Sequence, residues 1–152
     1  MEAKTKTTFR ILRFDPTDGN PPRFDRYEVP VREGQTVLEG LFYVLDKLDG
    51  SISFRYSCRG AVCGSCAMFI NGAYRLACAT LIANLQSDTV TIGPLPNMPV
   101  IKDLVVDMSL FLENYERVKP YLINDETPPE KEWRQSPKDR KKIDEMTNCI
   151  LC

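Results

Sequence analysis

Four of the six cysteines in this chain have the spacing of an iron-ligand set. Cys58, Cys63, Cys66 and Cys78 follow the pattern C-x4-C-x2-C-x11-C. This spacing is typical of the thiolates that bind a plant-type [2Fe-2S] cluster, so we predict these residues as the cluster ligands. A structural zinc module is disfavoured, because zinc sites usually pair two short C-x2-C knuckles and, among these four cysteines, only Cys63 and Cys66 have that spacing.

The first three of these cysteines lie in one short segment, residues 57–66, with the sequence SCRGAVCGSC. We call this segment the cluster loop. Gly60 and Gly64 are predicted where the backbone must bend tightly around an inorganic core. Arg59 either favours the more negative, reduced state of a cluster or is an ordinary solvated charge. A disulfide framework or a set of buried apolar cysteines would not explain three thiols crowded into one such loop.

The fourth cysteine is predicted to return to the cluster loop on a β-hairpin. Asn-Gly at residues 71–72 is a strong signal for a two-residue type I′ turn. Counting outward from that turn pairs Cys66 with Ala77 and places Cys78 one step from Cys66. The long spacing before the fourth cysteine therefore has a geometric explanation.

The elements that precede the cluster loop must position it. Residues 7–14 are rich in β-forming side chains and residues 26–31 alternate apolar with polar ones, so both are predicted as strands. The turn-forming residues 15–22 between them indicate an antiparallel hairpin. Residues 36–39 have a capping-box sequence, and the apolar stripe after them predicts a helix that Gly50 ends.

Further β-structure is predicted at residues 52–56 and 89–92, on either side of the hairpin at 66–78. Two strands, a helix that crosses them and more strands form a β-grasp pattern. We therefore predict an α+β fold that begins with a β-grasp, plant-type [2Fe-2S] ferredoxin-like domain over residues 1–95, with the cluster loop at one edge of the sheet.

The character of the sequence changes after a proline-rich connector at residues 94–99. Apolar residues from 101 to 118 recur at helical spacing, which predicts a helix. Serine followed by proline at residues 136–137 predicts the start of a second, charged helix. These features predict a helical domain that begins within residues 96–152.

Charge and composition exclude several classes of function. The 20 basic and 21 acidic residues give a net charge of -1, which leaves no electrostatic footprint for nucleic acid. The chain contains no histidine, which excludes Rieske-type clusters, Cys2His2 zinc sites and His-based catalysis. No apolar run reaches the length of a membrane span, so we expect a reducing, cytoplasm-facing location and contact with a membrane only through a partner.

The sequence as a whole closely resembles the iron-sulfur subunit of succinate dehydrogenase and fumarate reductase. The resemblance rests on the cluster loop, LAC at residues 76–78, PLP at 94–96, VIKDLVVDM at 100–108, KPYL at 119–122 and CILC at 149–152. It implies a peripheral electron-transfer subunit on the cytoplasmic face of the inner membrane. The implied partners are an FAD-containing flavoprotein subunit, which the [2Fe-2S] cluster faces, and membrane anchor subunits with quinone.

The same resemblance implies a [4Fe-4S] and a [3Fe-4S] cluster in a complete subunit. Cys149 and Cys152 look like the first two thiolates of the [4Fe-4S] motif, which continues as C-x2-C-x2-C-x3-C-P. Residues 96–152 would then be the start of an all-α, bacterial-ferredoxin-like domain. Because the chain ends at Cys152, we expect either a fragment, which is favoured, or one half of a split subunit.

Two related classes of protein remain as alternatives: a [2Fe-2S] ferredoxin, or a small iron-sulfur subunit of another flavin or molybdenum oxidoreductase. A free [2Fe-2S] ferredoxin would usually be more acidic and would not need the helical segment after Pro99. A small iron-sulfur subunit of a molybdenum hydroxylase should show a second complete set of four cysteines, which is absent. The chain also lacks a G-x-G-x-x-G dinucleotide motif, so we expect no catalytic residues and no activity from it alone.

Overall fold

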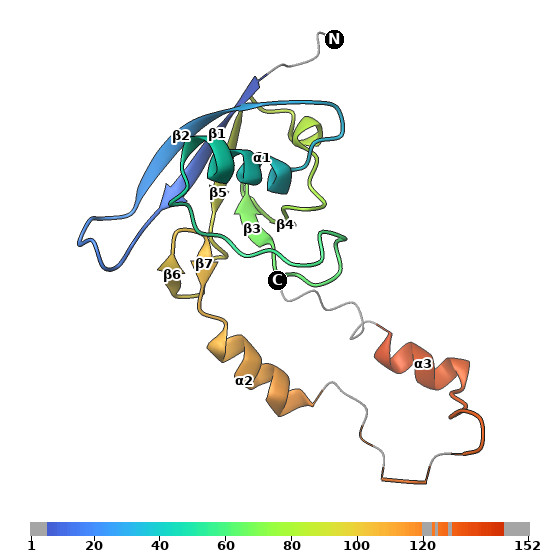
Figure 1. The fold of residues 1–152 in the computed structure, drawn as a ribbon. Coiled ribbons are helices and arrows are strands. Elements are labelled where there is room, and N and C mark those ends of the chain that lie inside the picture. The colour runs from blue at the N-terminus through green and yellow to red at the C-terminus, as the bar shows by residue number, and fades with distance from the viewer. Residues whose placement is uncertain (1–5, 120–122, 124, 128, 145–152) are drawn as a thin grey trace. The chain divides into compact units, whose positions relative to one another are not determined.

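Residues 6–119, 123, 125–127 and 129–144 are described by the computed structural model (Figure 1). These residues divide into two units, with the boundary after Asp107, and each unit is described by itself. Cys149 and Cys152, for which we predict a role as [4Fe-4S] ligands, lie outside the described residues. The domain limits 1–95 and 96–152 stay a prediction.

The first unit is built on a mixed sheet of five strands in the order β2-β1-β5-β3-β4. The strands are β1 (Lys6–Arg13), β2 (Arg23–Pro30), β3 (Ala67–Ile70), β4 (Ala73–Leu76) and β5 (Thr89–Gly93). Strand β1 pairs antiparallel with β2 and parallel with β5, and β3 pairs antiparallel with both β4 and β5. The two predicted hairpins and the predicted strand at 89–92 are confirmed.

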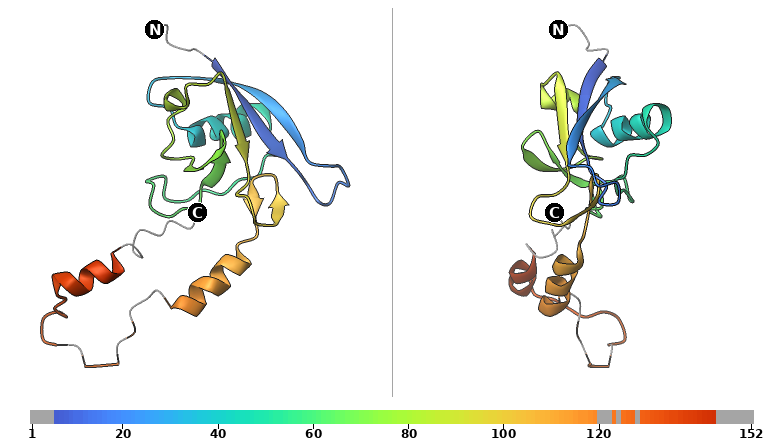
Figure 2. Two further views of the ribbon diagram at one scale, coloured as in Figure 1. Left: turned by 180° about the vertical axis from the view of Figure 1, so that it is seen from behind. Right: turned by 90° about the vertical axis from the view of Figure 1, so that its left-hand side faces the viewer.

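Helix α1 (Val37–Tyr43) covers one face of this sheet, as Figure 2 shows. The predicted capping box starts it: the N–H of Glu39 donates to the Thr36 hydroxyl, and the carboxylate of Glu39 accepts from the N–H of Thr36. A π-helical segment, η1 (Val44–Leu48), continues it, and η2 (Ile82–Leu85) is a short 3-10 helix after the hairpin.

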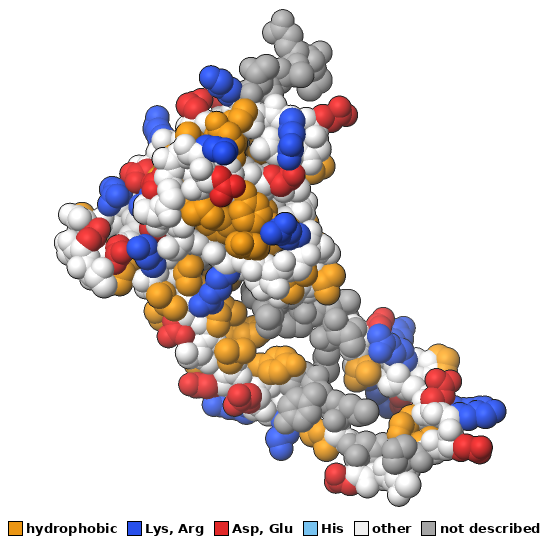
Figure 3. Space-filling view, in the orientation of Figure 1, with side chains coloured by type: hydrophobic (Ala, Val, Ile, Leu, Met, Phe, Trp, Pro, Cys, Tyr) orange, Lys and Arg blue, Asp and Glu red, His pale blue; other side chains and the backbone are white. Residues whose placement is uncertain are grey.

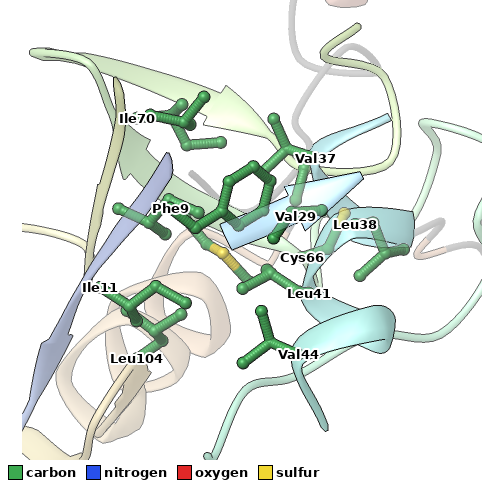
Figure 4. Packing of buried hydrophobic residues seen from close by; sticks show 14 of the residues in the cluster. Phe9, Ile11, Val29, Val37, Leu38, Leu41, Val44, Cys66, Ile70 and Leu104 are labelled. Atoms are coloured by element: carbon green, nitrogen blue, oxygen red, sulfur yellow. The ribbon is translucent and has the colours of Figure 1, made fainter. Parts of the chain in front are cut away.

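The hydrophobic core lies between α1 and the sheet (Figure 4). Phe9 and Ile11 from β1 are fully buried there together with Leu41 from α1. An added Cβ at Gly40 would clash with the ring of Phe9, so glycine permits the close approach of helix and strand. Cys66 is buried in the same cluster, which fixes the end of the cluster loop to the core.

The helix predicted over residues 101–118 is wrong for residues 101–106, which lie in the hairpin of β6 (Val100–Lys102) and β7 (Val105–Val106). The hairpin turns at Asp103, whose φ is 48° and whose side chain is buried. The Asp103 carboxylate accepts hydrogen bonds from Arg13 Nε, from the N–H of Phe14 and from the N–H of Ser53. These tertiary contacts override the helical spacing of the apolar residues.

The β-structure predicted at residues 52–56 is also not observed, because these residues, all of them described, form no strand. The N–H of Ser53 donates to the Asp103 carboxylate, and the carbonyl of Ser53 accepts from the N–H of Leu104. The segment is therefore held by the β6-β7 hairpin instead of by a sheet ladder.

The second unit contains α2 (Ser109–Val118) and α3 (Pro137–Ile143) among its described residues. The predicted start of α3 is confirmed: the hydroxyl of Ser136 accepts from the N–H of Asp139, and proline follows at the first helical position. Helix α2 has no buried residue. None of the helices in the described ranges is both long and apolar enough to cross a membrane.

Candidate metal centre

The β3-β4 hairpin brings the fourth cysteine back to the cluster loop. Asn71 and Gly72 have φ values of 47° and 81°, as a type I′ turn requires. The predicted register is confirmed, because the N–H of Ala77 donates to the carbonyl of Cys66 over 3.0 Å. Cys78 therefore follows β4, which is an edge strand of the sheet, next to Cys66.

The four predicted ligands lie in two pairs. In the first pair, the N–H of Cys58 lies 3.4 Å from Sγ of Cys63, and the N–H of Cys63 lies 3.4 Å from Sγ of Cys58. In the second pair, the N–H of Cys78 lies 3.4 Å from Sγ of Cys66. In the part of the chain that the structure describes, no three His, Cys, Asp or Glu side chains are close enough to hold one metal ion.

This arrangement fits a di-iron cluster. A [2Fe-2S] cluster would be held by four cysteine thiolates, and the two pairs supply that number. The N–H groups that point at the sulfurs, including that of Gly60, which lies 3.3 Å from Sγ of Cys58, would stabilise the negative charge of bound thiolates.

The backbone of the cluster loop bends at residues 59–63, Gly60 among them. The left-handed conformation occurs at Gly64, with φ of 72°, but also at Arg59 and Ala61, with φ of 56° and 59°. Gly60 lies between these two residues and is not left-handed. For a side chain with a Cβ, that conformation costs roughly 1–2 kcal/mol, so the surrounding contacts must hold Arg59 and Ala61 in place.

The two thiol pairs differ in their electrostatics. The hydroxyl of Ser65, helped by the N–H groups of Cys58 and Ser65, lowers the pKa of Cys63 to about 6. Burial raises the pKa of the Cys66 thiol to about 11. Iron binds the thiolate form, which the lowered pKa of Cys63 favours and the raised pKa of Cys66 opposes.

An aromatic platform beside the cluster loop has no counterpart in the sequence prediction. The rings of Phe42, Phe54 and Tyr56 contact one another, with centroids 4.7 Å apart for Phe42 and Tyr56 and 5.7 Å apart for Phe42 and Phe54. The guanidinium of Arg59 lies over Phe42 and Tyr56. Figure 3 shows hydrophobic side chains exposed next to α1 on the first unit. The available signal was the pair of aromatic residues just before the cluster loop.

Comparisons with known proteins agree with this chemistry. A family described as "2Fe-2S iron-sulfur cluster binding domain" matches residues 8–113. The succinate dehydrogenase iron-sulfur subunit of Paracoccus denitrificans is 46% identical over 145 residues, which are 95% of this chain and 56% of that protein. The fumarate reductase iron-sulfur subunit of Mycobacterium tuberculosis is 42% identical over 149 residues, which are 97% of this chain and 60% of that protein.

Among solved structures, the chain is similar to a chain of the Mycobacterium smegmatis Sdh1 complex in the apo form. The TM-score is 0.77 and the sequence identity is 32%, over 99% of this chain and 63% of that chain. The chain therefore spans less than two thirds of the length of the relatives it matches.

Proposed function

We propose that this chain, a member of the 2Fe-2S iron-sulfur cluster binding domain family, relays single electrons in a succinate dehydrogenase or fumarate reductase complex. It matches the iron-sulfur subunits of such complexes along nearly its whole length. The observation that carries the proposal is the pairing of the four thiols at the meeting point of the cluster loop and the hairpin.

The residues that would hold the [2Fe-2S] cluster are Cys58 with Cys63 and Cys66 with Cys78. The bound cluster supplies a one-electron redox couple. Loop N–H groups donate toward the sulfurs, and Arg59, the residue after Cys58, carries a positive charge, so both would favour the more negative reduced state.

The partners follow from the kind of complex. We propose an FAD-containing flavoprotein subunit as the electron donor or acceptor on one side, and a membrane anchor with quinone on the other. The chain would then be a peripheral protein, held by these partners at the cytoplasmic face of the inner membrane. In a complete subunit, Cys149 and Cys152 would ligate a [4Fe-4S] cluster in an all-α domain that also carries a [3Fe-4S] cluster.

The flavoprotein supplies what this chain lacks for succinate chemistry. Oxidation of succinate removes two electrons and two protons, whereas the chain has no histidine and no dinucleotide-binding motif. We therefore expect no succinate oxidation by the chain alone. Mixed anaerobically with its cognate flavoprotein, the cluster-loaded chain should become reduced when succinate is added.

The test follows the visible absorption of the oxidised cluster and the half-integer spin signal of the reduced one. The control omits the flavoprotein and should show no change. No succinate-dependent reduction in the presence of a competent flavoprotein would count against the proposed complex. Reduction by succinate without a flavoprotein would count against the relay role.

A further inference from the structure

Arg59 is the residue directly after the ligand Cys58, and its side chain is held by two aromatic rings. Its guanidinium carbon lies 5.2 Å from the ring centroid of Phe42 and 5.5 Å from that of Tyr56. These distances are within the range of a cation–π interaction. The backbone of Arg59 is left-handed, with φ of 56°, so this residue needs external contacts to keep its conformation.

Phe42 is the fixed part of this arrangement. It belongs to α1 and packs against the buried core, whereas Tyr56 is 44% exposed and lies just before the cluster loop. The contact between the rings of Phe42 and Tyr56 is edge-on, with an interplanar angle of 86°. Arg59 therefore connects the ligand-bearing loop to the helix through Phe42.

We propose that Phe42 is a positioning residue for the [2Fe-2S] site, acting through Arg59. The face of its ring holds the guanidinium, and this contact fixes both the position of the Arg59 charge and the backbone of the Cys58–Cys63 half of the loop. This inference rests on the proposed function only for the presence of the cluster. Arg59 is exposed, so without the ring contact its charge would sample many positions, with a weaker average effect on the sulfurs.

The first test is a double-mutant cycle on the full chain loaded with its cluster, read as the midpoint potential. Arg59→Gln removes the charge and should lower the potential. Phe42→Leu keeps an apolar side chain but removes the ring face, and it should reproduce most of that shift with unchanged iron and sulfide content. Added to Arg59→Gln, it should cause little further shift, because its effect passes through Arg59.

Two further variants separate positioning from simple packing. Phe42→Tyr keeps the ring face and should retain the wild-type potential. Phe24→Leu is the matched control, because it removes a similar contact far from the cluster loop. The guanidinium carbon of Arg10 on β1 lies 4.0 Å from the ring centroid of Phe24 on β2, the edge strand opposite β4. Phe24→Leu should leave the potential unchanged. Equal shifts from Phe42→Leu in the presence and absence of Arg59, or no shift from it at all, would overturn the proposal.

A second readout does not need the cluster. In the metal-free chain under reducing conditions, Phe42→Leu should speed hydrogen exchange at the N–H groups of Gly60 and Cys63, but not at that of Ala77 in the hairpin. Unchanged exchange at Gly60 and Cys63 would also overturn the proposal. If Phe42→Leu does not fold, Phe42→Met also keeps an apolar side chain without the ring face and takes its place in both tests. A chain that binds no cluster but shows the exchange effect would refute the proposed function and not the positioning role.

Discussion

Replacing Cys58 with alanine is expected to abolish the [2Fe-2S] cluster completely. The cluster needs all four thiolates, and a core left with three would expose one iron to water and oxidant. Cys58 also accepts the N–H groups of Gly60 and Cys63, so the variant loses the organisation of that half of the loop as well. The measurement is the visible spectrum and the acid-labile sulfide content of the anaerobically prepared chain.

The matched control is the double variant Cys149→Ala with Cys152→Ala, which also removes thiols but leaves the loop and hairpin intact. It should bind the [2Fe-2S] cluster like the wild type. A wild-type spectrum in the Cys58 variant would refute the ligand assignment. Loss of the spectrum in the control would show that the two sets of cysteines are mixed.

The second large effect is expected from Asp103→Ala, which should lower the free energy of unfolding of the first unit by about 3–5 kcal/mol. Nε of Arg13 lies 3.1 Å from the Asp103 carboxylate, and the two side chains are 7% and 2% exposed. Removing the carboxylate leaves a buried guanidinium with one partner fewer. It also leaves the N–H groups of Phe14 and Ser53 without their acceptor.

Urea unfolding of the metal-free chain measures this effect, provided that the m-value is unchanged. The control is Asp25→Ala: Asp25 lies 3.6 Å from Nη1 of the same arginine but is 29% exposed. Its loss should cost no more than about 1 kcal/mol. If both variants lost the same free energy of unfolding, burial would not explain the contribution of Asp103 to stability, contrary to our interpretation.

The parts of the structure that the sequence predicted are those with local causes. Asn71 and Gly72 determine the hairpin turn, and the turn determines which residues pair beside Cys66. The Thr36 and Glu39 pair starts α1 because both hydrogen bonds of a capping box form within one helical turn. In these cases the residues that determine the conformation are close together in the chain.

The parts that the sequence did not predict depend on distant partners. The apolar residues of 101–118 fit a helical period, but Asp103 bonds to Arg13, 90 residues away, and turns the first of them into a hairpin. Likewise, Phe42 is one more apolar residue of a helix until the fold places Arg59 over its ring. No local pattern reveals that contact.

The measurement that tests the central claim most directly is the cofactor content of the full chain prepared without oxygen. We predict the iron and acid-labile sulfide content of a single [2Fe-2S] cluster, with a half-integer spin signal that appears on reduction with dithionite. Zinc bound to Cys58, Cys63, Cys66 and Cys78 with no labile sulfide would contradict the account.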